Sequence, residues 1–170
     1  MDRLLYLVLL GFILASCNEK DSQQSQSESY PENLGQISFD ASIDKEDFQL
    51  CDTSILVQSR RAIAYEGRDK ALEEECRKQL NLSENETNYD VYIMARFLIN
   101  CRKETGRIRL QTLDVQFLEQ DCPAELKEEI RSCVLSLNKW IFTRPNNQGK
   151  DHSKFLNFKF SNGELQTIIH

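Results

Sequence analysis

Histidine is scarce in this chain of 170 residues, which contains only two. His152 lies beside a loop and His170 ends the chain; a lone histidine at the start of a strand is most often a solvated surface residue rather than a base or a ligand. The motifs G-x-S-x-G, H-E-x-x-H, G-x-x-x-x-G-K and G-x-G-x-x-G are also missing, which leaves hydrolases, metalloproteases and nucleotide-binding enzymes without support. We therefore expect a protein that is not an enzyme, with no catalytic residues, cofactor or metal site.

A basic stripe is missing as well. The chain has 21 Lys and Arg against 27 Asp and Glu, a net charge of −6. Binding to nucleic acid needs clustered cations that neutralise phosphates, so this class of partner is excluded. The same balance argues against a polybasic contact with a membrane. Asp40, Asp44, Glu46 and Asp47 form an acidic cluster without the spacing of a calcium loop, and we expect solvated charge there.

No apolar run is long enough to span a membrane, because the longest, Leu4 to Leu14, has eleven residues and about 20 are needed. Arg3 precedes this run, and Leu14-Ala15-Ser16-Cys17 follows it, which is the order of a bacterial lipoprotein signal. We predict that residues 1–16 are a signal peptide and that Cys17 is lipidated, with a diacylglycerol on its thiol and an acyl chain such as palmitate on its amine. An ordinary secretory signal cut near the same residues is the alternative. In both cases the mature chain leaves the cytoplasm.

Residues 17–34 are predicted to be the lipidated cysteine and a flexible tether, because Ser, Gln, Glu, Asp and Asn dominate there and such a segment cannot bury enough apolar surface to order itself. Asn18, rather than an aspartate, follows Cys17. We therefore expect an outer-membrane lipoprotein, on the periplasmic face or the cell surface, held to the lipid bilayer through acylated Cys17.

Five cysteines remain after Cys17, and in an oxidising compartment an odd number leaves at least one unpaired within the chain. No two stand at C-x-x-C spacing, so thioredoxin-like and zinc-ribbon patterns are excluded. We expect one or two structural disulfides with a buried leftover thiol, and spacing alone does not give the pairing. Cys101 is flanked by Arg102 and Lys103, a setting that lowers a thiol pKa, so a reactive thiol is the alternative there. The five are Cys51, Cys76, Cys101, Cys122 and Cys133.

Residues 35–170 are predicted to form one α+β domain, in which a small antiparallel sheet of about four strands in two hairpins carries helices on one face. The strands follow from alternation of apolar residues and the helices from apolar positions three and four apart. Gly106 is expected to supply a positive φ in the turn of the first hairpin. Strands are predicted at 37–39, 91–100, 107–116, 154–160 and 164–169, helices at 53–66, 69–82 and 123–139, and a loop at 144–151.

The second half of the chain resembles a known family. Phe97-Leu98-Ile99-Asn100-Cys101 ends the first long strand, a helix closes on Trp140, and the strand Phe158-Lys159-Phe160 leads to Asn162-Gly163. Together with Lys103-Glu104-Thr105-Gly106-Arg107 and Gly149-Lys150, in this order and spacing, these residues resemble the TonB C-terminal-like domain over residues 91–170, in a form common among Bacteroidetes envelope proteins. In that group an asparagine-cysteine accompanies an upstream phenylalanine-x-x-cysteine, here Phe48 to Cys51. The resemblance therefore implies a disulfide between Cys51 and Cys101.

The resemblance also implies a domain that recognises an envelope partner by strand addition. The chain lacks the uncleaved membrane helix and, with three prolines, the Pro-rich spacer of energy-transducing members, so we expect a protein-protein binding module rather than an energy transducer. An open sheet edge can dock an extended segment of a partner. The candidate binding edge is the last strand: Glu164, Leu165, Gln166, Thr167, Ile168 and Ile169.

Two other functions stay open. A periplasmic or secreted small-ligand binder would use a pocket between the sheet and the helices predicted over residues 53–82. A thiol-reactive protein would work through Cys101. Homodimerisation through the free sheet edge or the odd cysteine is also compatible with the sequence.

Overall fold

The computed structural model describes residues 37–52, 56–58, 61–80 and 89–169, and the statements below concern these. All of them belong to the compact unit formed by Asn33–His170. Cys17, the signal peptide and nearly all of the predicted tether lie outside the described residues.

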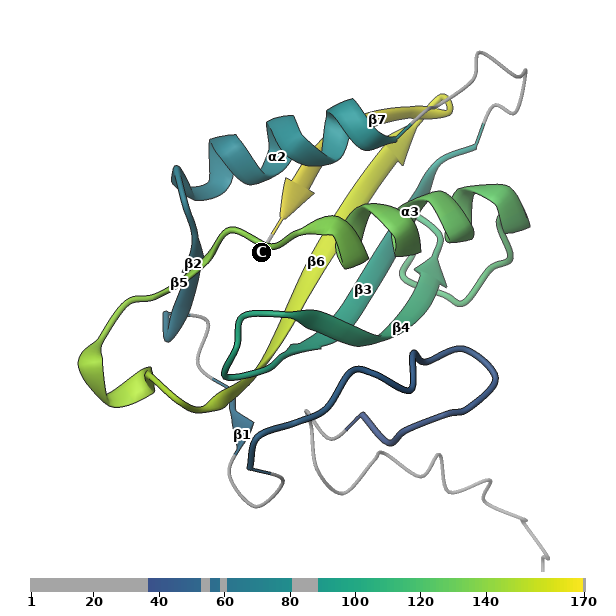
Figure 1. The fold of residues 1–170 in the computed structure, drawn as a ribbon. Coiled ribbons are helices and arrows are strands. Elements are labelled where there is room, and N and C mark those ends of the chain that lie inside the picture. The colour runs from purple at the N-terminus through teal and green to yellow at the C-terminus, as the bar shows by residue number, and fades with distance from the viewer. Residues whose placement is uncertain (1–36, 53–55, 59–60, 81–88, 170) are drawn as a thin grey trace, which may run out of the picture. The chain divides into compact units, whose positions relative to one another are not determined.

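A five-stranded, mostly antiparallel sheet forms the body of this unit (Figure 1). Its order is β1-β6-β3-β4, and β7 pairs with the end of β6 that β1 leaves open. The β1–β6 pair is parallel and the other pairs are antiparallel. The strands are β1 (Leu56–Val57), β3 (Val91–Ile99), β4 (Thr105–Leu113), β6 (Asp151–Ser161) and β7 (Glu164–Ile169).

The two central strands show why the alternating sequence folds as a sheet. Every second residue of β3, from Val91 to Ile99, is buried, and in β6 Leu156, Phe158 and Phe160 are buried on the same side. The two strands pair along their whole shared length, from Val91 opposite Phe160 to Ile99 opposite His152. The predicted α+β class and both predicted hairpins are therefore confirmed, and β1 adds a strand that was not predicted.

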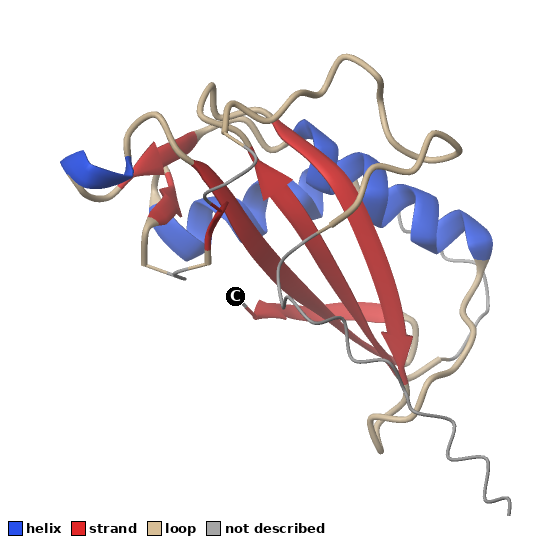
Figure 2. Ribbon diagram, turned by 90° about the horizontal axis from the view of Figure 1, so that it is seen from below, coloured by secondary structure: helices blue, strands red, loops and turns tan. Residues whose placement is uncertain are grey.

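Two helices, α2 (Arg68–Gln79) and α3 (Ala124–Ser136), cover one face of this sheet (Figures 1 and 2). Leu72 and Cys76 of α2, and Ile130 and Val134 of α3, are fully buried against it. The helices predicted at 69–82 and 123–139 are thus confirmed over the residues that the structure describes. Each is shorter than expected, because the chain becomes extended at Leu80 and at Leu137. No helix among the described residues is long and apolar enough to cross a membrane.

The helix predicted at 53–66 is wrong. Where this segment is described it forms β1 and β2 (Ile63–Tyr65), and β2 pairs antiparallel with β5 (Trp140–Phe142) in a separate two-stranded sheet. Ile63 and Tyr65 are buried with period two, and the Tyr65 ring meets Trp140 edge to face at 5.2 Å. A partner 75 positions away (140 − 65), rather than local propensity, decides this conformation.

The strand predicted at 37–39 is also wrong, because residues 37–50, which we call the strap, make no strand. Ile37 and Phe48 instead bury against Leu98 in a small second core, on the sheet face opposite the helices. Gly106 does not have a positive φ; Lys103 and Arg107 beside it do. A Cβ on Gly106 would lie 2.4 Å from Phe48 Cγ, so glycine is required there for close packing.

The remaining segments follow the sequence closely. β4 ends at Leu113, before the predicted 116, because the chain turns at Asp114. The predicted loop at 144–151 contains a single helical turn, η1 (Pro145–Asn147), and its last residue, Asp151, already belongs to β6.

Candidate functional site

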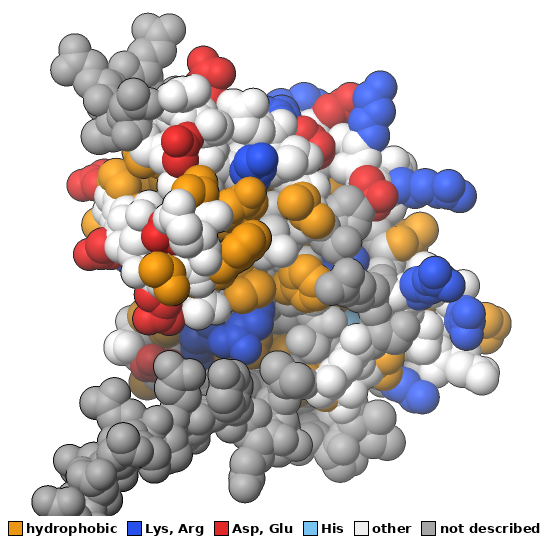
Figure 3. All heavy atoms as spheres, turned by 180° about the vertical axis from the view of Figure 1, so that it is seen from behind, with side chains coloured by type: hydrophobic (Ala, Val, Ile, Leu, Met, Phe, Trp, Pro, Cys, Tyr) orange, Lys and Arg blue, Asp and Glu red, His pale blue; other side chains and the backbone are white. Residues whose placement is uncertain are grey.

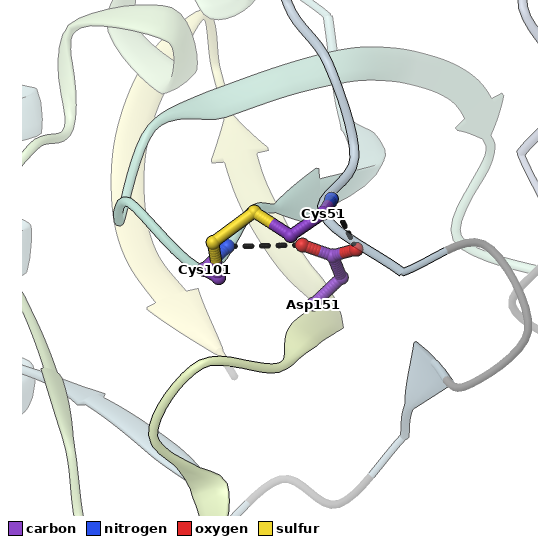
Figure 4. Close-up of side chains that lie close together, drawn as sticks. All are labelled: Cys51, Cys101 and Asp151. Atoms are coloured by element: carbon purple, nitrogen blue, oxygen red, sulfur yellow. Dashed lines mark hydrogen bonds between the residues drawn. A yellow bond between two sulfur atoms is a disulfide. The ribbon is translucent and has the colours of Figure 1, made fainter.

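A disulfide joins Cys51 at the end of the strap to Cys101 at the end of β3, with Cα atoms 6.0 Å apart. The Asp151 carboxylate, from the first residue of β6, lies against this bond (Figure 4). One of its oxygens accepts the backbone N–H of Cys101 at 2.9 Å, and the other accepts those of Cys51 at 2.8 Å and Asp52 at 2.9 Å. The implied pairing of Cys51 with Cys101 is confirmed. We call this arrangement the disulfide clasp.

The disulfide clasp brings two sulfur atoms and a carboxylate within 4.8 Å of one another, the residue types of a thiolate metal site. The two sulfurs are bonded to each other, however, and both carboxylate oxygens accept backbone N–H groups. A metal ion needs deprotonated thiolates and free carboxylate lone pairs. In its oxidised state the clasp is therefore a structural element.

Asn100 explains why an asparagine precedes Cys101. It is fully buried, and its side-chain amide donates to the Gln49 carbonyl at 3.0 Å and to a Glu104 carboxylate oxygen at 2.6 Å. Its side-chain oxygen accepts the backbone N–H groups of Arg102 and Glu104. The hydrogen bond that the side-chain amide of Asn100 donates to Glu104 lowers the pKa of the Glu104 carboxyl group. One side chain thus fixes the β3–β4 turn and ties it to the strap beside the disulfide.

Cys101 is not a free thiol in this structure, which weighs against the thiol-reactive alternative. The free cysteines among the described residues are Cys76, Cys122 and Cys133. Cys76 on α2 and Cys133 on α3 are fully buried, and a hydrogen bond between their thiols, together with burial, raises the pKa of Cys76. A thiol held in its neutral form is a poor nucleophile. Cys122 is half-buried, with its sulfur 3.6 Å from Thr112 Oγ1.

His152 is fully buried rather than solvated, so the expectation for this residue is wrong. It follows Asp151 into β6, where β1 and β3 pair on either side of it. Its Nε2 lies 3.3 Å from the Asn147 carbonyl oxygen, while Nδ1 is buried without a partner among the described residues. Burial lowers the pKa of the imidazole below 6.5, the contact with Asn147 opposing this in part. Among the described residues, the hydrogen-bond partner of the ring is this backbone carbonyl and not a nucleophile or a carboxylate.

The acidic cluster is only partly solvated, because Asp44 leaves it to form an ion pair. Its side chain is 1 % exposed, and its two carboxylate oxygens accept hydrogen bonds from the two terminal nitrogens of Arg109, at 2.8 and 2.7 Å. The hydrogen bond from Arg109 lowers the pKa of Asp44, and the same bond raises the pKa of Arg109. Asp47 stays exposed, as expected.

The candidate binding edge is an edge strand, because within the described part of the chain β7 pairs with β6 alone. The edge is nevertheless covered in part. Arg77 of α2 donates to the backbone carbonyl oxygens of Leu165 at 2.7 Å and Gln166 at 2.8 Å, and a β-bulge interrupts the ladder between Lys159 and Phe160. Side chains and bulges of this kind protect exposed edges from unwanted pairing.

A groove of about 580 Å³ lies along the other edge of the sheet, beside β4. The Ile108 carbonyl on this edge accepts a hydrogen bond from Arg131, and the Thr112 carbonyl accepts the Gln120 N–H. The chain after β4 therefore occupies the edge at the last residues of the strand, and a side chain covers it at Ile108. Lys127 at the rim is paired with Asp121 at 2.6 Å, and the Glu119 carboxylate, which also lines the groove, accepts a hydrogen bond from the Gln111 amide at 3.0 Å.

The clasp contains the residue that sequence reasoning missed. Asp151 was placed in a loop, and its only sequence signal was position, directly before the alternating run of β6.

The comparisons add no relative: no protein-family model matches the chain, and neither the search of curated proteins nor the search of solved structures found a match.

Proposed function

We propose that this chain is an exported envelope lipoprotein, lipidated at Cys17, whose domain is a protein-protein binding module without enzymatic activity. The disulfide clasp is the observation that carries the export. Structural disulfides persist in oxidising compartments and are rare in the cytosol. The backbone N–H groups of both cysteines in this disulfide donate to the buried carboxylate of Asp151, which lies 50 positions after Cys101. It agrees with the predicted signal peptide, residues 1–16, which directly precedes Cys17.

The anchor is tested by the intact mass of the protein from the membrane fraction. We expect a chain that begins at Cys17 and carries the added mass of a diacylglycerol and an acyl chain. A mature protein without lipid mass on Cys17 would contradict the anchor and leave an ordinary secreted protein.

Binding through β7 is the mode that the two sheet edges favour. Backbone occupies the edge of β4 at its end, through the bond from Gln120 to Thr112 and the bridge between Leu113 and Glu119, whereas on β7 the covering group found among the described residues is the side chain of Arg77. A side chain can rotate away and leave its carbonyl acceptors to an incoming strand, while a backbone segment would have to unfold. We therefore propose that an extended segment of an outer-membrane or envelope protein adds to Glu164–Ile169.

The test is photo-cross-linking in intact envelopes, with a photoreactive residue at Gln166 and mass spectrometry of the products. Arg77→Met removes the covering guanidinium, so we expect recovery of the cross-linked partner to rise severalfold. Lys78→Met is the matched control, because it removes a neighbouring exposed cation for which the described residues show no hydrogen bond or ion pair to β7. Equal recovery in both variants, or recovery of bulk lipoproteins alone, would overturn strand addition at this edge.

A further inference from the structure

The sheet face opposite the helices is apolar where it is not covered by the strap. We call the residues of β3, β4 and β6 that point away from α2 and α3 the open face. Hydrophobic side chains gather on it in the view from behind (Figure 3). By the alternation of the strands and their half-buried state, the open face includes Tyr92, Met94, Leu113 and Phe155. An antiparallel sheet usually presents polar residues on a solvated face, so this composition indicates that something docks there.

A rigid turn at the rim of the open face adds three exposed apolar side chains. Val115 is 52 %, Phe117 68 % and Leu118 65 % exposed. The Asp114 carboxylate accepts the backbone N–H groups of Gln116 and Leu118, and the Asp114 N–H donates to the Leu118 carbonyl. Phe117 stands at φ +64°, a costly conformation for an aromatic residue, and its ring stacks on Tyr92 at 5.4 Å.

The charges of the open face differ from those of the whole chain. Its positions on β3, β4 and β6 carry four cations and one carboxylate, that of Asp151, which is buried in the disulfide clasp, although the chain has a net charge of −6. Asp44 neutralises Arg109, while Lys159 lies over the Tyr92 ring at 5.8 Å and Arg96 makes no ion pair with a described residue. Cations beside aromatic and aliphatic side chains are the composition of a surface that meets the interface of an anionic membrane. The four are Arg96, Arg107, Arg109 and Lys159.

The chain also enters the domain on this side. Ile37, the first described residue, packs against Leu98 of the open face. Nineteen residues, 18–36, separate it from Cys17, and a polar coil of that length spans about 24 Å. A connection of this length is short enough to hold the domain close to any membrane that Cys17 enters.

We propose that the open face and the turn at 114–118 dock on the surface of an anionic phospholipid bilayer, an inference that rests on the proposed anchoring at Cys17. The Phe117 and Leu118 side chains enter the interface, and Arg96 and Lys159 meet phosphate groups. Helices α2 and α3 and the Arg77 side of β7 then face away from the lipid, where a partner can reach them.

The test uses the mature chain, residues 17–170, with a hexahistidine tag in place of Cys17, bound to vesicles that contain nickel-chelating lipid. This attachment does not need natural lipidation, so failure of the proposed anchor and failure of docking are separate results. A photoreactive residue replaces Asn157 on the open face, or Glu74 on the exposed side of α2 as the reference position. On vesicles of phosphatidylcholine and phosphatidylglycerol at 7:3, we expect about tenfold more lipid adducts at position 157 than at 74.

Charge and apolar contacts are then removed separately. Each cation near an anionic surface contributes about fivefold in binding, so Arg96→Gln with Lys159→Gln is expected to lower the adducts at 157 toward the level at 74. Phe117→Ser with Leu118→Ser should do the same, while Lys70→Gln with Lys78→Gln, an equal loss of charge on α2, should leave them unchanged. Equal adducts at 157 and 74 in the parent chain, or equal losses in both charge variants, would overturn the proposal.

Discussion

The backbone N–H of Cys101 donates to the buried carboxylate of Asp151 at 2.9 Å, which couples the oxidised cysteine pair to the first residue of β6. The strap, the turn after β3 and the start of β6 therefore meet at one carboxylate. Three charge-assisted hydrogen bonds, rather than the covalent bond alone, define this corner of the domain.

We expect Asp151→Asn to lower the free energy of unfolding by about 3 kcal/mol, because an amide offers one acceptor oxygen where three N–H groups converge. Its disulfide should also be reduced faster by dithiothreitol, since the Cys51 backbone is no longer fixed. Urea unfolding measures the first effect and thiol titration against time the second. Asp47→Asn, on the exposed part of the strap, should change neither; an unchanged reduction rate in Asp151→Asn would show that the carboxylate does not hold the clasp.

Gly106→Ala should cost about 2 kcal/mol, because its Cβ would lie 2.4 Å from the Phe48 ring. The cause is overpacking and not backbone strain, so the added variant Phe48→Ala should remove most of the effect of the alanine. A double-mutant cycle by urea unfolding measures the coupling. Additive costs would mean that the strap does not pack against the turn in solution.

Removal of the Asp44 carboxylate should cost about 2 kcal/mol at pH 7, since it leaves the Arg109 guanidinium without its partner. The folded-state pKa of Asp44 lies below its ordinary value of 3.8. The ion pair therefore stabilises the protein fully above about pH 4, and its contribution is lost as the pH falls through the lowered pKa. Unfolding curves at pH 7 and pH 3 should show a cost for Asp44→Asn that shrinks in acid; a cost that does not depend on pH would exclude the charge as its cause.

Burial of His152 should make the stability of the protein depend on pH in a second, higher range. Its folded-state pKa lies below the ordinary 6.5, so the unfolded chain binds more protons as the pH drops below 6.5 and stability falls until the folded-state pKa is passed. His152→Gln should remove this loss between about pH 6.5 and pH 5, whereas His170→Asn should keep it. The midpoint of thermal unfolding across that range is the measurement, and a slope retained in His152→Gln would assign the titration elsewhere.

The buried thiols should be inert in the native protein. We expect N-ethylmaleimide to label Cys122 first, because Cys76 and Cys133 are buried and their hydrogen bond keeps the Cys76 thiol protonated. Peptide mass spectrometry before and after denaturation in urea separates the three residues. Native labelling of Cys76 as fast as that of Cys122 would mean that α2 opens from the sheet.

The sequence predicted the elements whose pattern is local. The period-two burial of β3 and β6 and the apolar stripe of α3 are written in consecutive residues, and both were predicted with ends correct to within about three residues. The helix prediction for residues 63–65 was wrong because Ile63 and Tyr65 suit a helix as well as a strand. The pairing with the distant strand that begins at Trp140 decides between them.

The sequence predicted the disulfide of the clasp but not its carboxylate, because the partners of both are distant along the chain. The pairing of Cys51 with Cys101 came from a family resemblance, which carries long-range information that spacing does not. Asp151 and His152 looked like the polar end of a loop, and nothing in their neighbours shows that β1, β3 and the strap close over them. The pair formed by Asp44 and Arg109 is hidden in the same way, by 65 positions of chain.

The pairing of β3 with β6 also sets the order in which this domain can fold. Val91 lies opposite Phe160, 69 positions later (160 − 91), and a ladder between such distant segments has a high contact order and forms slowly. The β3–β4 hairpin is local and can form early, but the other edge of β3 has no partner until β6 is free to reach it. The domain can therefore complete its core only after β6 has been synthesised, and until then the hairpin exposes the apolar side chains of Val91–Ile99 that β6 later helps to bury.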